Sequence, residues 1–173
     1  MITSTQNEKV KLAKALQTTA KSRRKEGKIA LEGVRLVRDA VQEGHQPDFI
    51  FTSPDVEADL LGWLRARGIQ IVEVSDEVMR HLSDTQQPQG VLGVFPMPQP
   101  ILPEHPNRLL ILDSIRNPGN LGTILRTAGA ASVDAVLLSP TCADPYNPKV
   151  LRGGMGAHFR VPVMAMSWEQ IAE

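Results

Sequence analysis

Apolar positions recur along the N-terminal half with two periods, which predict alternating helices and strands. Residues 7–17 place apolar side chains every three or four positions, as in a short amphipathic helix. Residues 90–95 form a short apolar run of the strand type. The same criteria predict further elements between them: strands at 29–31, 49–52 and 69–74, and helices at 34–43, 55–67 and 75–82, the last capped by Ser75. Such alternation predicts an α/β fold with a largely parallel sheet.

The composition changes at residues 96–106, where five prolines fall within eleven residues. This proline density excludes a helix or a central strand, so we expect a linker. A second α/β pattern follows it: a near-continuous apolar strand at 108–113, a helix after the turn at 117–122, a strand at 135–139, a short helix near 148–151, a strand around 160–164 and a helix start at Ser167. The near-continuous apolar strand is typical of a parallel sheet buried on both faces. We therefore expect domains at 1–95 and 107–173, joined by a linker at 96–106.

Composition limits the classes of protein to consider. The chain has 173 residues, 42% of them apolar, and 19 basic residues balance 19 acidic ones. A neutral chain lacks the general positive field of a protein that coats nucleic acid, so a polyanion must meet a local patch. The single cysteine, Cys142, excludes a disulfide framework, and with four scattered histidines it argues against a zinc cluster. No apolar run approaches the ~18–20 residues of a membrane span, and we expect a soluble, cytoplasmic protein without a metal.

Charge is concentrated near the N-terminus. Residues 8–35 contain nine basic and three acidic side chains. We expect Arg23, Arg24 and Lys25 to lie in a basic loop after the first helix. Such an excess indicates either a footprint for phosphate or a solvated face.

The turn at 117–122 lies where open α/β sheets bind ligands, beyond the carboxyl end of a strand. Arg126 falls at the border of the buried helix face, near this turn, and a guanidinium there can pair with phosphate or favour ionisation of a hydroxyl. The alternative is structural: Pro118 and Gly119 form a tight turn, Asn120 caps the helix and Arg126 is solvated. The segment lacks the dinucleotide-binding glycine pattern and the lysine of a P-loop.

A second polar segment covers residues 147–163. Lys149 and Arg152 are three residues apart and share a helix face, and the glycines at 153, 154 and 156 allow backbone N–H groups to approach a ligand closely. The alternative is a structural loop with two surface bases. We expect Asp113 to form a cap or a turn, and we assign no role to the following residues: Cys142, Tyr146 and His158.

These segments resemble a known family. LDSIRNPGNLGTILRTAGAASVDAVLLSP followed by NPKVLRGGMGAHFRVPV is similar to the SpoU (TrmH-like) RNA 2'-O-ribose methyltransferases of the SPOUT superfamily. RRKEGKIALEGVRLVRDAV and TQQPQGVLGV resemble the small domain that precedes the catalytic domain in many members. The resemblance implies an L30e-like N-terminal domain followed by a SPOUT-type α/β methyltransferase domain. Asn120, Gly122 and Arg126 match the motif Asn-x-Gly-x-x-x-Arg.

The resemblance also implies a reaction: transfer of a methyl group from S-adenosylmethionine to a ribose 2'-hydroxyl of structured RNA, above all ribosomal RNA, by a homodimer. Arg126 would activate the hydroxyl, and Asn120 would hold the loop and the target nucleotide. The resemblance also implies contacts with RNA phosphates through Lys149 and Arg152, and with the RNA body through Arg23, Arg24 and Lys25. The main cofactor-binding residues are unknown, and the candidates within this chain are Gly154 and Gly156.

The chain departs from the family pattern in two places. Many members have a serine where this chain has Gly154. The family's C-terminal segment, which threads into a trefoil knot and forms most of the cofactor pocket, is absent from this chain, so we expect these residues alone to bind S-adenosylmethionine poorly. A non-catalytic RNA-binding protein that retains the scaffold is therefore the main alternative, and a Rossmann-type nucleotide enzyme is a third.

Overall fold

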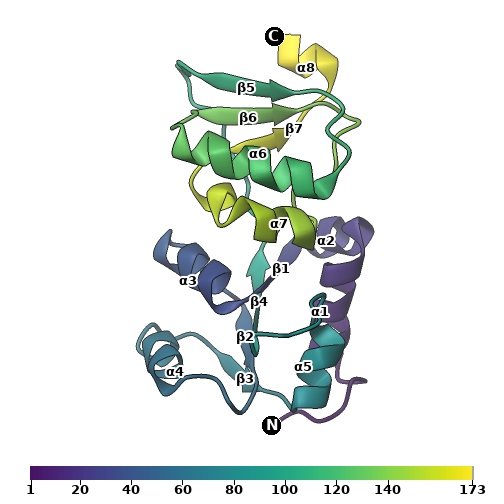
Figure 1. The fold of residues 1–173 in the computed structure, drawn as a ribbon, viewed down its shortest axis with the longest axis vertical. Helices are drawn as coiled ribbons and strands as arrows, with labels where there is room; N and C mark the ends of the chain where they lie inside the picture. The colour runs from purple at the N-terminus through teal and green to yellow at the C-terminus, as the bar shows by residue number, and fades with distance from the viewer. Residues whose placement is uncertain (173) are drawn as a thin grey trace. The chain divides into compact units, whose positions relative to one another are not determined.

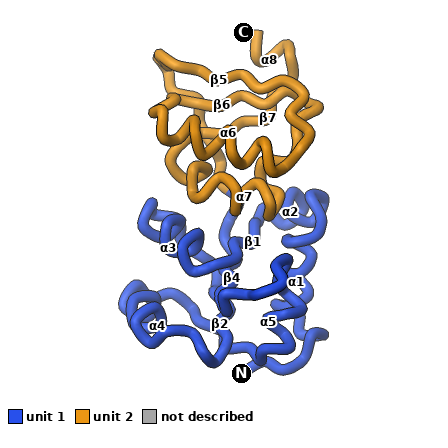
Figure 2. Tube along the Cα trace, in the orientation of Figure 1, with its two compact units in different colours: residues 1–97 blue, residues 98–173 orange. Residues whose placement is uncertain are grey.

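The structure is a computed structural model that describes residues 1–172, and its chain divides into two compact units (Figure 2). Unit 1 covers residues 1–97 and unit 2 begins at Pro98. No helix within residues 1–172 is long and apolar enough to cross a membrane.

Unit 1 contains a four-stranded sheet with helices on both faces (Figure 1). Its elements are α1 (Glu8–Thr18), α2 (Ala20–Glu26), β1 (Lys28–Glu32), α3 (Val34–Gln42), β2 (Phe49–Thr52), α4 (Ala58–Arg65), β3 (Ile71–Glu73), α5 (Asp76–Leu82) and β4 (Val91–Pro96). One hydrophobic cluster joins α1 and α5 to alternate residues of the strands, among them Ala30, Phe51 and Leu92. The intervening strand residues, including Ile29 and Ile50, are also fully buried, on the face of α3 and α4.

The predicted largely parallel sheet is wrong for unit 1. The strand order is β1-β4-β2-β3, and β4 lies antiparallel to both of its neighbours. Only β2 and β3 pair in parallel. The final strand enters between β1 and β2, a non-local pairing that the periodicity of single segments does not encode.

The predicted basic loop after the first helix is also wrong, because these residues form α2. The Thr19 side chain accepts from the backbone N–H of Ser22, and Gly27 ends the helix with a left-handed backbone (φ 61°). Between these two caps, the sequence AKSRRKE consists mostly of strong helix formers.

Unit 2 contains a three-stranded sheet in the order β5-β6-β7, with both pairings parallel, as predicted. Its elements are β5 (Leu109–Leu112), α6 (Pro118–Ala130), β6 (Ala135–Leu138), α7 (Pro148–Gly154), a 3₁₀ helix η1 (Ala157–Phe159), β7 (Val163–Ala165) and α8 (Trp168–Ala172). The core packs Leu121 and Leu125 of α6 and Val150 of α7 against the sheet. Figure 1 shows α6 and α7 beside this sheet.

The prediction that the first strand of unit 2 is buried on both faces is wrong. β5 is an edge strand, and its side chains alternate between two environments. Leu112 packs into the core, whereas Leu109 and Ile111 are 42% and 47% exposed. An apolar run shows that a strand can be buried on both faces, but not which neighbours cover it. Residues 97–108, between β4 and β5, form neither helix nor strand.

Candidate active site

The polar segment after β5 begins α6 with a well-formed cap. Asn117, not Asn120, is the N-cap residue: its Oδ1 accepts from the backbone N–H groups of Gly119 at 2.8 Å and Asn120 at 3.2 Å. Pro118 follows as the first helical residue. Proline suits this position because an N–H group there would have no carbonyl partner within the helix. The alternative in which Asn120 is a cap is therefore wrong. Asn120 lies in the first helical turn with its residue exposed, and its side chain forms no hydrogen bond with residues 1–172.

Gly122 allows α6 and α7 to approach at backbone distance. A Cβ atom at this position would lie 2.9 Å from the carbonyl oxygen of Val150 and 3.0 Å from the Cα of Gly153. Real Cβ atoms do not come this close to backbone, so the crossing requires glycine. Arg126 is four residues further on, about 40° around the helix from Gly122, and so faces the same neighbouring helix.

The side chain of Arg126 reaches the end of α7. Its Nη1 donates to the Sδ of Met155 at 3.4 Å. Met155 ends α7 in a left-handed conformation (φ 47°), which turns the chain toward Gly156. Arg126 lies about 12 Å along the helix axis from Pro118. The structure therefore corrects its expected position: the guanidinium lies beside the turn after α7, and not near the turn that precedes α6.

The guanidinium of Arg126 carries a positive charge without an acidic partner in the described part of the chain. Arg126 is exposed, and no carboxylate of residues 1–172 lies within ion-pair distance of it. A thioether carries no charge, so Met155 orients the guanidinium without neutralising it. This arrangement can hold an anion or stabilise negative charge that develops on an oxygen.

A network of hydroxyl groups lies at the carboxyl ends of β5 and β6. The Oδ1 of Asp113 accepts from the hydroxyls of Ser114 and Ser139, each at 2.9 Å. The Ser114 hydroxyl also lies 2.9 Å from that of Thr141. Ser114 has a left-handed backbone (φ 58°), which its N–H···Oγ contact with Ser139 at 3.2 Å helps to hold. The Asp113 carboxylate accepts from side-chain hydroxyls, and its expected role as a cap or turn former stays a prediction.

Two residues without a predicted role form hydrogen bonds with backbone carbonyl groups of unit 2. His158 is 7% exposed, and its Nε2 lies 2.8 Å from the carbonyl oxygen of Pro145, which can only accept. Burial lowers the pKa of His158 to about 4, so the ring is neutral near pH 7. Tyr146 donates to the carbonyl oxygen of Pro98 at 3.2 Å, and burial raises its pKa to about 12.

Gly154 faces this histidine ring. A Cβ atom on Gly154 would lie 2.9 Å from Cε1 and 3.1 Å from Nδ1 of His158. The space that a serine side chain would occupy is therefore filled by imidazole. Gly154 is buried, and its contact with the cofactor stays a prediction. Gly156 is also buried, and it begins η1 with φ 81°.

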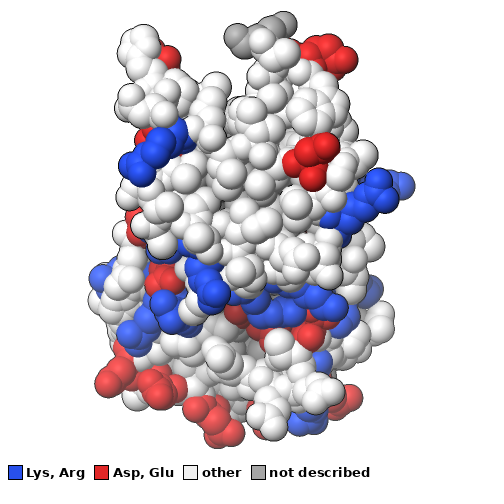
Figure 3. Space-filling view, turned by 45° about the horizontal axis from the view of Figure 1, so that its top comes forward, with Lys and Arg blue, Asp and Glu red and all other residues white. Residues whose placement is uncertain are grey.

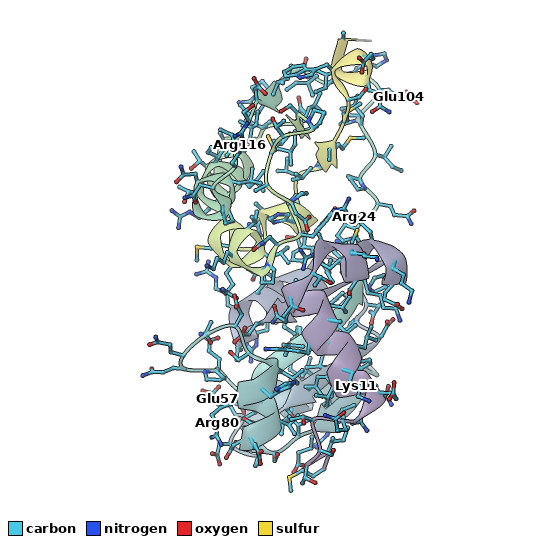
Figure 4. All side chains as sticks on the ribbon, turned by 90° about the vertical axis from the view of Figure 1, so that its right-hand side faces the viewer. Lys11, Arg24, Glu57, Arg80, Glu104 and Arg116 are labelled. Atoms are coloured by element: carbon cyan, nitrogen blue, oxygen red, sulfur yellow. The ribbon has the colours of Figure 1, made fainter. Side chains whose placement is uncertain are left out.

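The basic candidates are in different environments. Arg23 is 3% exposed and donates to the carbonyl oxygen of Leu16 at 2.6 Å, so its guanidinium serves unit 1 itself. Arg24 and Lys25, its neighbours on α2, are exposed, and Arg24 is labelled in Figure 4. Lys149 is exposed on α7, whereas Arg152 is half-buried. On the face shown in Figure 3, basic side chains gather in groups with acidic ones among them.

Reasoning from the sequence missed Met155 and the serine network. Nothing in the local pattern identifies Met155, because its contact depends on the crossing of two helices. Ser139 and Thr141 follow an apolar strand, a signal that could have placed them beside Asp113. Within residues 1–172, no group of three or more His, Cys, Asp or Glu side chains is arranged to hold a metal ion.

Comparisons with known proteins agree with this division of the chain. A family model described as the MRM3-like substrate binding domain matches residues 7–93, and that of the SpoU rRNA methylase family matches residues 107–173. Two relatives share much of the sequence. Over 169 residues the chain is 40% identical to rRNA methyltransferase 3, mitochondrial, of Homo sapiens, covering 91% of this chain and 40% of that protein. Over 170 residues it is 35% identical to 23S rRNA (guanosine(2553)-2'-O)-methyltransferase RlmP of Bacillus subtilis, covering 94% and 64%.

A solved structure is similar over nearly the whole chain. The AdoMet-bound rRNA methyltransferase of Sinorhizobium meliloti superposes with a TM-score of 0.83 at 32% identity, covering 99% of this chain and 66% of that one. The chain thus spans two fifths of the length of its human relative and about two thirds of the two bacterial proteins.

Proposed function

Because the chain belongs to the SpoU rRNA methylase family, we propose that the protein transfers a methyl group from S-adenosylmethionine to a ribose 2'-hydroxyl of ribosomal RNA. The relative from Bacillus subtilis is named as a 2'-O-methyltransferase of 23S rRNA, and the structure from Sinorhizobium meliloti is titled as bound to AdoMet. These names support the methyl donor, the RNA class and the position on the ribose.

The observation that carries the proposal is the uncompensated guanidinium of Arg126. A ribose hydroxyl is a weak nucleophile at neutral pH, so the reaction needs stabilisation of the alkoxide that develops on O2'. Arginine stays protonated in proteins and cannot act as a general base. Its contribution is a fixed positive charge, held by Met155 at 3.4 Å and exposed to a substrate.

Asn120 is proposed to hold the target nucleotide. Asn117 satisfies the first-turn N–H groups, so the Asn120 amide is left for a ligand. Asn120 and Arg126 lie about 120° apart around α6 and about 9 Å apart along it. This separation is compatible with one nucleotide between them, the ribose near Arg126 and another part of the nucleotide near Asn120.

Contacts of Gly154 and Gly156 with S-adenosylmethionine stay a prediction. The ring of His158 fills the space beside Gly154, and Gly156 is buried at the start of η1. We therefore derive no step through the cofactor from these residues. When bound, it supplies the electrophilic methyl group, and the residues described here act on the RNA side of the reaction.

RNA contacts are proposed for the exposed bases. Arg24, Lys25 and Lys149 are exposed and can neutralise phosphates. The affinity that such contacts contribute falls as the salt concentration rises. Arg152 is retained as a phosphate contact at the edge of α7. Arg23 is not, because it donates into unit 1.

The test is analysis of the modified nucleoside. The full-length protein is incubated with S-adenosylmethionine carrying a labelled methyl group and unmodified 23S rRNA, which is then digested to nucleosides. The label is expected in one 2'-O-methylated nucleoside, with none in a methylated base. Label in a base, or none at all, would contradict the proposal.

The alternative of a non-catalytic RNA-binding protein predicts a different result. Calorimetry of the full-length protein at millimolar S-adenosylmethionine would then give no heat of binding, whereas an enzyme binds. The homodimer and the cytoplasmic location stay predictions. The human relative carries a mitochondrial name, and light scattering of the purified protein measures the oligomeric state.

A further inference from the structure

Two arginines of unit 1 contact a single tryptophan ring. The Cζ of Arg67 lies 4.0 Å from the ring centroid of Trp63, and that of Arg38 lies 5.6 Å from it. Arg38 comes from α3, Trp63 from α4, and Arg67 from the turn that follows α4. The Nη1 of Arg67 also donates to the backbone carbonyl of Trp63 at 3.1 Å, which fixes that guanidinium over the indole.

The positive charge of this cluster is not neutralised. Within residues 1–172, neither Arg38 nor Arg67 has an acidic side chain within ion-pair distance, and the Nε of Arg38 is buried without a hydrogen-bond partner. Arg35, one turn earlier on α3, has a 74% exposed side chain and reaches Asp39 only at 3.9 Å. Arg35, Arg38 and Arg67 thus contribute three guanidinium groups, and within residues 1–172 the one carboxylate at ion-pair distance from any of them is that of Asp39.

The chemistry of the cluster favours nucleic acid as its partner. A guanidinium held flat on an aromatic ring extends the planar surface, and single-stranded bases stack on both kinds of group. The same guanidinium groups can pair with the phosphates on either side of a stacked base. An acidic protein surface would satisfy the charges, but it would gain nothing from the stack of Arg67 on Trp63.

We propose that the cluster of Arg38, Trp63 and Arg67 binds an unpaired nucleotide of the RNA substrate, with its base stacked on the guanidinium–indole surface and its phosphate on the neighbouring arginines. This inference rests on the proposed function for the identity of the partner. It assigns an RNA contact to α3 and α4, in addition to the exposed basic residues of α2.

The direct test uses the fluorescence of Trp63. Trp63 and Trp168 are the two tryptophans of the 173-residue sequence, so the Trp168→Phe variant of this chain reports on Trp63 alone. Titration with a single-stranded RNA 12-mer is expected to quench the Trp63 emission, and a fully paired duplex of the same length is expected to quench it much less. Binding without any quenching would overturn the proposal.

A charge-preserving variant separates stacking from simple attraction. Arg38→Lys/Arg67→Lys keeps both positive charges but removes the planar groups, and it is expected to weaken binding of the single-stranded RNA roughly tenfold. Arg65→Ala is the matched control: it removes a charge from an exposed residue of α4 about 160° around the helix from Trp63, and it should change affinity less than about twofold. Equal affinities of the lysine variant and the wild type would contradict the stack, as would equal competition by poly-glutamate in place of RNA.

Failure of this inference and failure of the proposed function are distinguishable. Quenching by RNA in a protein that methylates no ribose would leave the binding site intact and overturn the enzyme assignment. Full methyl transfer by the Arg38→Lys/Arg67→Lys variant at limiting RNA would overturn the stacking site and leave the enzyme assignment intact.

Discussion

Arg126 donates to the sulfur of Met155 at 3.4 Å, which joins the third turn of α6 to the residue that ends α7. This contact explains how a long, exposed side chain keeps one direction without an acidic partner. Met155→Leu keeps the apolar bulk but removes the acceptor. Loss of one such hydrogen bond, worth about 0.5–1.5 kcal/mol, should lower kcat about 2- to 10-fold while the RNA Kd is unchanged. A rise in KM at constant kcat would instead indicate a binding role for Met155.

The glycine at position 122 of the Asn-x-Gly-x-x-x-Arg motif is required by the packing of α6 against α7. Gly122→Ala would place a methyl group 2.9 Å from the Val150 carbonyl oxygen, and backbone on both sides cannot yield locally. We expect the free energy of unfolding to fall by about 1–3 kcal/mol, measured by denaturant titration.

The control for this substitution lies in the same helix. A Cβ on Gly129 would meet Ala157 Cβ at 3.4 Å, an ordinary contact, so Gly129→Ala should be neutral or stabilising because alanine favours the helix. Similar losses in both variants would show that the α6–α7 crossing is not the cause.

Gly154, where many family members have a serine, lies against the ring of His158. Gly154→Ser forces a Cβ to 2.9 Å from Cε1 of the imidazole and should cost about 1–3 kcal/mol of stability. In a double-mutant cycle with His158→Ala, the two losses should fall short of additivity by at least about 0.5 kcal/mol, because the smaller residue frees the space. Strictly additive losses would mean that the two side chains do not compete.

Burial of His158 predicts that unit 2 is less stable in acid. The pKa of His158 is about 4 in the folded chain, against 6.5 for an ordinary histidine, because burial outweighs the favourable effects of the Pro145 carbonyl and of Asp144. Between these two pH values the unfolded state binds the additional proton, so stability falls as the pH drops from 6.5 toward 4. The loss should reach about 3 kcal/mol.

Denaturant titrations of the wild type and His158→Gln at pH 7, 6, 5 and 4 measure this effect. The variant should lose the part of the pH dependence that belongs to the histidine, while the carboxylates titrate alike in both proteins. Parallel stability curves for the two proteins would contradict the assignment.

Local signals in the sequence predicted most elements but not their partners. Ser75 caps α5 as expected, and Phe49–Thr52 is a strand with the predicted bounds, because caps and apolar runs act over a few residues. The antiparallel entry of β4 and the open face of β5 depend on distant segments and could not be predicted in this way. α2 could have been predicted, since Thr19 and Gly27 are ordinary cap residues at the two ends of a helix-forming run.

The candidate site likewise combines features that are local in the sequence with features that depend on tertiary contacts. The spacing of Asn120, Gly122 and Arg126 was visible in the sequence, and the resemblance gave it a meaning. The orientation of Arg126 toward Met155 depends on the close approach of Gly122 to Gly153, which is a tertiary property. The burial of Arg23 was hidden for the same reason, since a charge cluster does not show which guanidinium turns inward.

The rate of methyl transfer by Arg126 variants tests the central claim most directly. It is measured in single-turnover assays with the full-length protein, at saturating S-adenosylmethionine and 23S rRNA. Arg126→Ala is expected to lower this rate by about 100- to 1000-fold, the range for loss of a group that stabilises a developing oxyanion, while RNA affinity stays within a few fold. Methyl transfer at the wild-type rate in Arg126→Ala would contradict the account.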